Sequence, residues 1–235
     1  MRSKLSNAMF FILSLCILCS FLGSALLADK AVDAYNETAQ SDRVCVIIDA
    51  GHGGVDGGAV SCTGEKESNI NLEISLRLND LLHLLGINTK MIRTKDISVY
   101  TNGNSIAAKK ISDLKERVRI INQTKNAIMV SLHQNNFEDS QYSGAQVFYN
   151  SDPVLARTLQ EAFVKTINPG SKRKAKKADN IYLMQNINCP GYLIECGFLS
   201  NFREETLLRD PTYQKKLCCV IGAVLSCSIN NGTVA

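Results

Sequence analysis

The feature that most constrains the fold of this chain is a short apolar segment that runs into a glycine-rich loop. β-Branched and apolar residues fill Val44 to Ile48, and Asp49 and Ala50 lead into five glycines between positions 51 and 58. This pattern predicts a buried strand whose polar loop, with His52 in it, lies at the sheet edge where α/β folds bind ligands. The loop lacks the Lys-Ser/Thr ending of a P-loop and the G-x-G-x-x-G spacing of a dinucleotide site. A metal-binding His52 is therefore favoured over a phosphate site, and a purely structural histidine is the alternative.

Helical and strand-like hydrophobic patterns alternate through the rest of the chain. We expect helices at residues 69–85, 112–125, 152–167 and 211–229, and strands at residues 44–48, 87–93, 127–132, 145–149, 181–184 and 192–194. Ser112 is the expected cap of the second helix, and Asp152 with Pro153 begins the third. Strands separated by helices predict an α/β fold, a single domain with a mostly parallel or mixed central sheet flanked by helices.

The first 28 residues carry the marks of an export signal. Arg2 and Lys4 precede an uncharged run from Ala8 to Ala28, which contains a small-residue cleavage site at 23–25. The run is also long enough to span a bilayer, which takes about 20 apolar residues. Residues 1–28 are thus a signal peptide or an N-terminal membrane anchor, followed by a linker at 29–42, a catalytic domain at 43–230 and a tail at 231–235. We expect the domain to act outside the cytoplasm, either secreted or anchored to the membrane.

Charge and cysteine usage argue against a nucleic-acid-binding protein and against a fold stabilised by disulfides. A net charge of +4 and the absence of Trp argue against nucleic-acid binding, which normally needs a strong basic face interleaved with stacking aromatics. Outside the first 28 residues there are seven cysteines, an odd number with no C-x-x-C pair, so no disulfide framework is predicted. Most of them fall in apolar segments, where a free cysteine packs as a small core residue. The seven are Cys45, Cys62, Cys189, Cys196, Cys218, Cys219 and Cys227.

Only three histidines occur in the chain, and two of them follow predicted strands. His52 and His133 are placed alike, at the carboxyl ends of two strands, whereas His83 lies on the polar side of the first helix and is assigned to the solvated surface. Two histidines at one edge of a sheet predict a metal site. A catalytic zinc needs three protein ligands and keeps one position open, so a third ligand must come from nearby.

Acidic residues just after the glycine loop are the candidates for this third ligand. They are Glu65, Glu67 and Glu73, with Cys62 as a rival whose thiolate would make the site more like a structural one. Sequence position alone does not decide whether Glu65 or Glu67 is the third ligand. Glu195 follows another apolar strand, where a carboxylate is expected to have a raised pKa suited to acid–base work. The alternative for Glu195 is a helix-capping or salt-bridged carboxylate.

Five ordered motifs resemble one enzyme family. IIDAGHGGVDGGA, ESNINLEI, RVRIIN, SLHQN and YLIECGFLSN are similar to the zinc-dependent N-acetylmuramoyl-L-alanine amidases of the amidase-3 type over about residues 44–229. The resemblance implies that His52, Glu67 and His133 bind Zn²⁺ and that Glu195 is catalytic. The sequence departs little from the family pattern: Leu132 stands where isoleucine is usual, and Cys196 occupies the variable position after Glu195. Ten residues separate His133 from the next glycine, so the helical insertion that blocks some relatives is not expected.

The reaction that the resemblance implies is hydrolysis of the amide between N-acetylmuramic acid and L-Ala of peptidoglycan stem peptides. Zinc would lower the pKa of water toward ~7 and polarise the carbonyl, while Glu195 would carry the proton to the leaving amine. The alternatives are a zinc peptidase acting within the stem peptide, a Cys196 nucleophile beside His133, and a wall-binding module without metal. The last is disfavoured because all four site residues are present.

Further segments resemble the CwlD-like group of this family, which modifies spore cortex peptidoglycan. They are MIRTKD, KKISDLKERVRIIN and the basic KRKAKK at 172–177 before NIYLMQN. The group implies a role in sporulation and germination, in which a separate deacetylase completes muramic δ-lactam, and it is compatible with an activating protein partner in the forespore intermembrane space. A general autolysin is the competing role. Residues 172–177 either help to hold an anionic part of the substrate or form a solvated loop.

Overall fold

The computed structural model of the protein describes residues 43–233. From Val44 onward the chain forms one compact unit. The segments predicted as a signal peptide or membrane anchor (1–28) and as a linker (29–42) lie outside the described residues and stay predictions. Within residues 43–233, no helix is both long and apolar enough to cross a membrane.

A six-stranded sheet forms the centre of this unit, in the order β2-β1-β3-β6-β4-β5. The strands are β1 (Cys45–Ala50), β2 (Asn88–Met91), β3 (Ala127–Asn135), β4 (Gln146–Tyr149), β5 (Lys176–Lys177) and β6 (Gly191–Phe198). β1 pairs in parallel with β2 and β3, and β3 pairs in parallel with β6. β4 runs antiparallel to β6, and the short β5 lies parallel to β4 at the edge. The sheet is mixed and flanked by helices, which confirms the predicted fold class.

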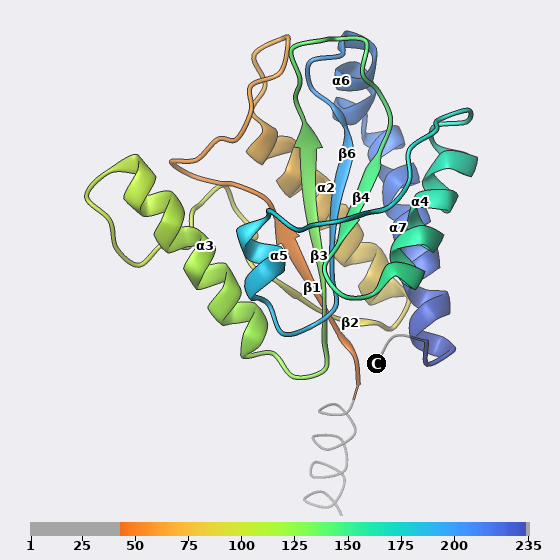
Figure 1. Cartoon of the computed structure of the whole chain (residues 1–235), viewed down its shortest axis with the longest axis horizontal. Coiled ribbons are helices and arrows are strands. Elements are labelled where there is room, and N and C mark those ends of the chain that lie inside the picture. Colours follow the sequence, from red (N-terminus) through yellow and green to blue (C-terminus); the bar gives the residue numbers. More distant parts are fainter. Residues whose placement is uncertain (1–42, 234–235) are drawn as a thin grey trace, which may run out of the picture. The chain divides into compact units, whose positions relative to one another are not determined.

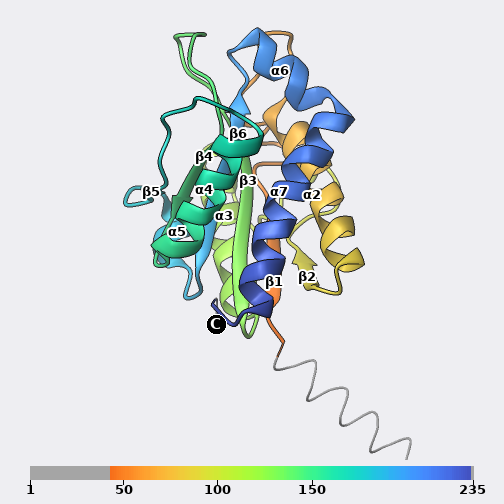
Figure 2. The same cartoon turned by 90° about the vertical axis from the view of Figure 1, so that its right-hand side faces the viewer.

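Helices cover both faces of the sheet (Figure 1). They are α2 (Glu67–Leu84), α3 (Ile106–Asn122), α4 (Pro153–Thr166), α5 (Tyr182–Asn186), α6 (Phe202–Arg209) and α7 (Pro211–Asn230). α2, α4 and α7 pack on one face, with α2 beside α7 (Figure 2), and α3 and α5 lie on the other. β1 is buried along its whole length because both faces are covered. Val46 and Ile48 pack on the α2 side, and Ile47 packs on the opposite side.

The helix expected at residues 112–125 begins earlier, at Ile106, as α3. Its cap is Ser105, whose hydroxyl accepts a hydrogen bond from a backbone N–H of the first turn. The predicted cap Ser112 is wrong: this residue is buried within the helix, where its Oγ accepts from two N–H groups of the preceding loop. The first turns escaped prediction because Ile106 and Ile111 are exposed. Those turns therefore lack the inward apolar stripe that marks a helix in sequence.

Two other elements differ from prediction. The strand expected at residues 181–184 is wrong, since this segment forms α5 and buries Leu183 and Met184 on the α3 side of the sheet. A short apolar run satisfies a strand or a buried helical turn equally well. α6 was not expected from the sequence. Its signal is Asn201, whose side chain caps the helix by accepting from the N–H of Glu204.

The cysteines divide between the core and the surface. All seven in the described residues are free; three are buried, one is half-buried, and Cys62, Cys219 and Cys227 are exposed. The half-buried one, Cys189, packs against the core, so four of the seven are core residues as predicted and three are not. Cys219 and Cys227 lie on α7, which is apolar enough to suggest burial but has an outward face.

Candidate active site

Three neighbouring parallel strands, β1, β3 and β6, end at the same edge of the sheet. His52 lies two residues beyond the end of β1, and His133 lies near the end of β3. Glu195 lies in β6, directly opposite His133 in the strand register. Glu67 is the first residue of α2, which leaves the glycine-rich loop at this edge. The topology thus gathers four residues that the sequence singled out.

His52, Glu67 and His133 form a tight cluster. One ligating atom from each lies within 4.8 Å of the others. Nε2 of His52 is 3.2 Å from Oε2 of Glu67, and Nδ1 of His133 is 2.9 Å from Oε1 of the same carboxylate. This arrangement can hold a metal ion, because imidazole nitrogens and a carboxylate oxygen converge on one point.

The other candidate ligands lie outside this cluster. The carboxylate of Glu65 accepts a hydrogen bond from the side chain of Asn69, and that of Glu73 accepts one from Gln214. Cys62 is exposed. His83 is exposed too and hydrogen-bonds Thr89 at 2.6 Å, as the assignment to the solvated surface predicted. Of the residues weighed as third ligand, only Glu67 joins the two histidines.

The carboxylate of Glu67 is buried and held from several directions. Oε2 accepts from the backbone N–H of Ala59, and Oε1 accepts from that of Gln134 and from the side-chain amide of Asn71. Burial works to raise the pKa of Glu67, but hydrogen bonds from His133 and His52 outweigh it and hold the pKa well below its usual range. Glu67 is therefore a fixed, ionised carboxylate.

Two glycines make room for these side chains. A Cβ at Gly51 would lie 2.2 Å from Nε2 of His133, so the imidazole packs against the bare backbone there. Gly58 has a φ of 70°, and its Cβ would lie 2.5 Å from Oε2 of Glu67. Any larger residue at either position would displace a member of the cluster. The glycines of this loop thus allow His133 and Glu67 to lie directly against the backbone.

Asp56 orients the imidazole of His52 by contacting the ring nitrogen that does not face Glu67. Its Oδ2 lies 2.9 Å from Nδ1 of His52, and its Oδ1 pairs with Nζ of Lys110 at 2.7 Å. Burial works to lower the pKa of His52, but the hydrogen bonds to Glu67 and Asp56 raise it to about 9. Carboxylates that fix the ring of a ligating histidine in this way are a regular feature of metal sites. Asp56 was not identified from the sequence, although its position four residues after His52 in the same loop is a usable signal.

Two buried arginines fix the backbone of the His52 loop. Nε of Arg93 donates to the carbonyl of Ala50, and its Nη2 donates to that of Gly51. Nη2 of Arg117 donates to the carbonyl of His52 at 2.7 Å. Sequence reasoning did not single out either arginine. Nothing local distinguishes an arginine that reaches across the fold from one on the surface.

Glu195 has a carboxylate without a partner. Its Oε2 is buried and meets no hydrogen-bond partner among residues 43–233, and it forms no ion pair there. Burial is the main cause that raises the pKa of Glu195 to about 7, against the opposing charge of His133. A carboxyl group that titrates near neutral pH can both accept and release a proton. The capping or salt-bridged alternative finds no support in these contacts.

Comparison with known proteins decides the family. The family described as N-acetylmuramoyl-L-alanine amidase (amidase-3) matches residues 46–225. This chain belongs to that amidase family. The germination-specific N-acetylmuramoyl-L-alanine amidase of Bacillus subtilis (strain 168) is 38% identical over 183 residues, which cover 75% of this chain and 76% of the relative.

Solved amidase structures agree with this assignment. The CwlD amidase from Clostridioides difficile, solved in complex with the GerS lipoprotein, matches with a TM-score of 0.75 and 38% identity over 80% of this chain and 100% of that chain. The amidase AmiC2 of Nostoc punctiforme matches with a TM-score of 0.69 and 25% identity over 80% of this chain and 97% of its own. The predicted family and the predicted enzyme class are confirmed.

The thiol of Cys196 in this amidase is not suited to attack the substrate. Cys196 is fully buried among apolar residues on the α2 side of the sheet, and its Sγ lies 3.8 Å from the carbonyl oxygen of Ile194. Burial raises the pKa of this thiol far above its ordinary value. A nucleophilic cysteine needs a lowered pKa and access, so the Cys196 alternative is excluded.

The loop that follows β3 in the amidase is short. Between Asn135 and Gln146 the chain forms turns and bends but no helix. This agrees with the expectation that a blocking helical insertion is missing at this position. The face that carries Glu195 and His133 is therefore not covered by such an element within the described residues.

Proposed function

We propose that the amidase is a zinc enzyme in which His52, Glu67 and His133 hold the metal and Glu195 carries the proton. One observation supports this above the others. The ligating atoms of the first three lie within 4.8 Å of one another, at the sheet edge where β6 also places the unpartnered carboxylate of Glu195. Two imidazole nitrogens and one carboxylate oxygen are the donor set of catalytic zinc sites, and three protein ligands leave a fourth position open.

The residues around the cluster have separate tasks in this proposal. When bound, zinc supplies Lewis-acid polarisation of the scissile carbonyl and acidification of water. Asp56 holds the ring of His52 so that Nε2 points at Glu67. Glu195, with a pKa of about 7, takes the proton from the attacking water and passes it to the leaving amine of L-Ala. The reaction needs no covalent intermediate.

Metal analysis of a matched pair of variants tests the ligand set. His133→Ala should lose most of the zinc that the wild-type protein holds, because it removes one of three ligands. His83→Ala is the control, since His83 is exposed and contacts Thr89 rather than the cluster. It should keep the wild-type stoichiometry by elemental analysis. A full equivalent of tightly held zinc in His133→Ala would overturn the ligand assignment.

Peptidoglycan is the substrate of this family, and we further propose that the chain acts on the spore cortex. The support is its 38% identity both to a relative named germination-specific amidase and to the CwlD amidase. In this role the enzyme frees the lactyl carboxyl of muramic acid, and a separate deacetylase allows that carboxyl to close onto the amine as muramic δ-lactam. A general wall autolysin is the competing role.

We also propose a protein partner and an extracytoplasmic location. The CwlD amidase was solved together with the GerS lipoprotein, and a lipoprotein partner would meet this enzyme at a membrane surface. The basic, then apolar, N-terminal sequence supports export, with the domain either released or anchored by residues 1–28. Co-purification of the full-length chain with membranes, before and after a carbonate wash, separates these two forms.

A further inference from the structure

A β-bulge in β6 extends the active-site face beyond Glu195. Glu195 is paired with His133 and Phe198 with Asn135, so three steps along β6 match two along β3. The intervening Cys196 and Gly197 both lie on the opposite side of the sheet, against the core and α6. Because side chains two apart in β3 point the same way, the ring of Phe198 lies on the same side as the carboxylate of Glu195.

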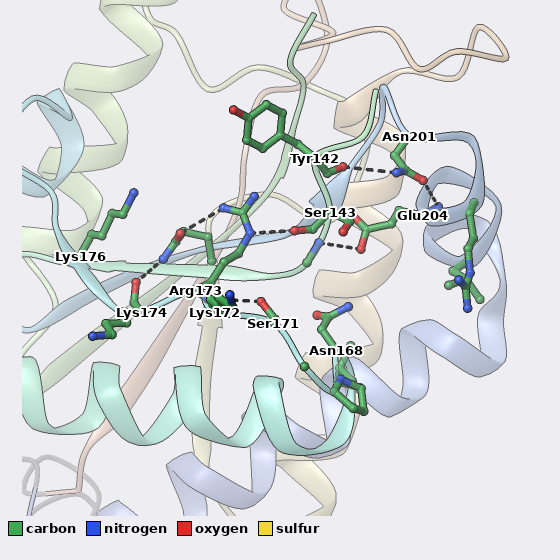
Figure 3. Close-up of a pocket in the computed structure, with 17 residues that line it drawn as sticks. Tyr142, Ser143, Asn168, Ser171, Lys172, Arg173, Lys174, Lys176, Asn201 and Glu204 are labelled. Carbon is green, nitrogen blue, oxygen red and sulfur yellow. Dashed lines mark hydrogen bonds between the residues drawn. The ribbon is translucent and has the colours of Figure 1, made fainter. Parts of the chain in front are cut away.

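Arg173 is fixed over this ring. Its Cζ lies 4.7 Å from the centre of the Phe198 ring. Nε donates to the carbonyl of Ser143 at 2.8 Å (Figure 3), and Nη1 donates to Oε1 of Gln146 at 3.1 Å. Gln146 is the residue of β4 directly opposite Glu195. Arg173 is thus held in one orientation by Gln146, the residue that is paired with Glu195 across the two strands.

The guanidinium of Arg173 keeps donors that nothing in the described residues uses. No hydrogen bond engages its Nη2 within residues 43–233, and it forms no ion pair there. Glu204, which lines the same cavity, interacts with Arg173 through its charge, but its two oxygens accept hydrogen bonds from the backbone N–H groups of Gly144 and Phe198. A half-buried guanidinium that is fixed in place and keeps unused donors can bind an anionic group without first being ordered.

The surroundings of Arg173 also favour an anionic ligand. It lines a cavity of about 900 Å³ beside β4 and β5, at one edge of the sheet. The same cavity is lined by four further cations, and Glu204 is the single acidic residue in its lining. The four are Lys172, Lys174, Lys176 and Arg203. Several positive charges raise the local concentration of an anion, and the oriented guanidinium fixes where its oxygens bind.

We propose that Arg173 is a specificity-determining residue that binds a carboxylate of the stem peptide while the muramoyl amide lies beside Glu195. The inference rests on the proposed function, which places that amide at the cluster. Phe198 covers one face of the guanidinium and two of its five N–H donors are used, so Nη2 is left to bind an anionic oxygen that lies in the plane of the group. A carboxylate is the anionic group that a stem peptide carries, and it suits these donors.

Paired substrates test this role. We would compare a muramoyl peptide that carries a free carboxylate in the stem with the same compound carrying a carboxamide, and measure kcat/KM for both. Wild-type enzyme should prefer the carboxylate by about 10-fold or more, mainly through KM, because an unpaired charged donor penalises the neutral analogue. Arg173→Met should lower the ratio to about 1. Arg173→Lys, which keeps the charge but not the planar fork, should give an intermediate ratio.

Lys177→Met is the matched control, because it removes one charge from the same basic segment. Lys177 is exposed and does not line the cavity, and its Nζ lies 3.8 Å from Oδ1 of Asp179. Its ratio should equal that of the wild type. A wild-type ratio near 1, or a preference that survives in Arg173→Met, would overturn the role of Arg173. Cleavage of neither compound by zinc-loaded wild-type enzyme would instead contradict the proposed function, so the two failures are distinguishable.

Discussion

His52 departs from ordinary backbone geometry. Its φ of 60° lies in the left-handed region, which costs a non-glycine residue about 1–3 kcal/mol. Surrounding contacts maintain it: Arg117 binds its carbonyl and Asp56 its ring. Strain of this kind persists where a side chain must be aimed, and in this loop it turns the imidazole toward Glu67.

Replacing the carboxyl group of Glu195 by an amide tests its role in proton transfer separately from metal binding. Glu195→Gln should keep the zinc content of the wild type, because Glu195 lies outside the ligand cluster. The variant should lower kcat by about 100-fold or more, since an amide cannot carry the proton. Elemental analysis and turnover on purified peptidoglycan measure the two quantities on one sample.

Glu65→Gln serves as the control for this substitution. Glu65 was the rival candidate from the sequence, but its carboxylate is occupied by Asn69 outside the cluster. Both zinc content and turnover should stay near wild type. Near-normal turnover in Glu195→Gln would mean that another group acts as the base.

Some residues of the site could be predicted from the sequence pattern, and others could not. His52 and His133 could be placed from strand ends alone, because parallel strands bring their carboxyl ends to one edge. Glu67 could not be separated from Glu65 by that reasoning, since the choice depends on where α2 begins, and only the family resemblance selected it. Arg117 was not identified because the groups that it reaches in β1 and the His52 loop lie about 65 residues away in the chain, and its nearby partner Asp113 gives no hint of them. The carboxylate–imidazole contact of Asp56 depends equally on the folded loop.

At the scale of elements, α3 is tied to β1 by a buried ion pair. Arg117 bonds the carboxylate of Asp49, which also accepts from Oγ of Ser131 at 2.7 Å. Burial works to raise the pKa of Asp49, but the charge of Arg117 and these hydrogen bonds outweigh it and lower the pKa. The pair therefore stays charged in the core, where each partner depends on the other.

Arg117→Met should destabilise the fold strongly. Removing one partner leaves the carboxylate of Asp49 buried and uncompensated, which costs about 3–5 kcal/mol. Arg119→Met, two residues further along α3, removes an exposed guanidinium paired with Glu116 and should leave the free energy of unfolding close to that of the wild type. Urea unfolding followed by circular dichroism compares the two. Equal losses would contradict the assigned role of the buried pair.

The strands of the sheet centre were predictable, whereas short elements were not. β1 and β3 are continuous apolar runs because helices cover both faces, and such runs are visible in sequence. α5 was mistaken for a strand because five residues give too little periodicity to separate the two. The early start of α3 was hidden by exposed isoleucines. Each failure occurred where tertiary contacts, rather than the local pattern, decided the structure.

At the scale of the whole molecule, the proposed cortex role predicts a phenotype. Deleting the gene should leave spores that form but lack muramic δ-lactam and germinate poorly, while vegetative cells separate normally. The reason is that no other reaction in the proposed scheme frees the lactyl carboxyl for ring closure. Mass analysis of cortex muropeptides and a germination assay measure the outcome. Chained vegetative cells with a normal cortex would assign the enzyme to general wall turnover instead.

The most direct test of the account identifies the bond that this site cuts. Purified protein loaded with zinc should be incubated with peptidoglycan, and the products should be analysed by mass spectrometry. We predict peptides with a free L-Ala amino terminus and glycan strands whose muramic acid keeps a free lactyl carboxyl, with both lost after zinc is chelated and restored when it returns. Glycan strands that still carry L-Ala, released together with shortened peptides, would show cleavage within the stem and contradict the account.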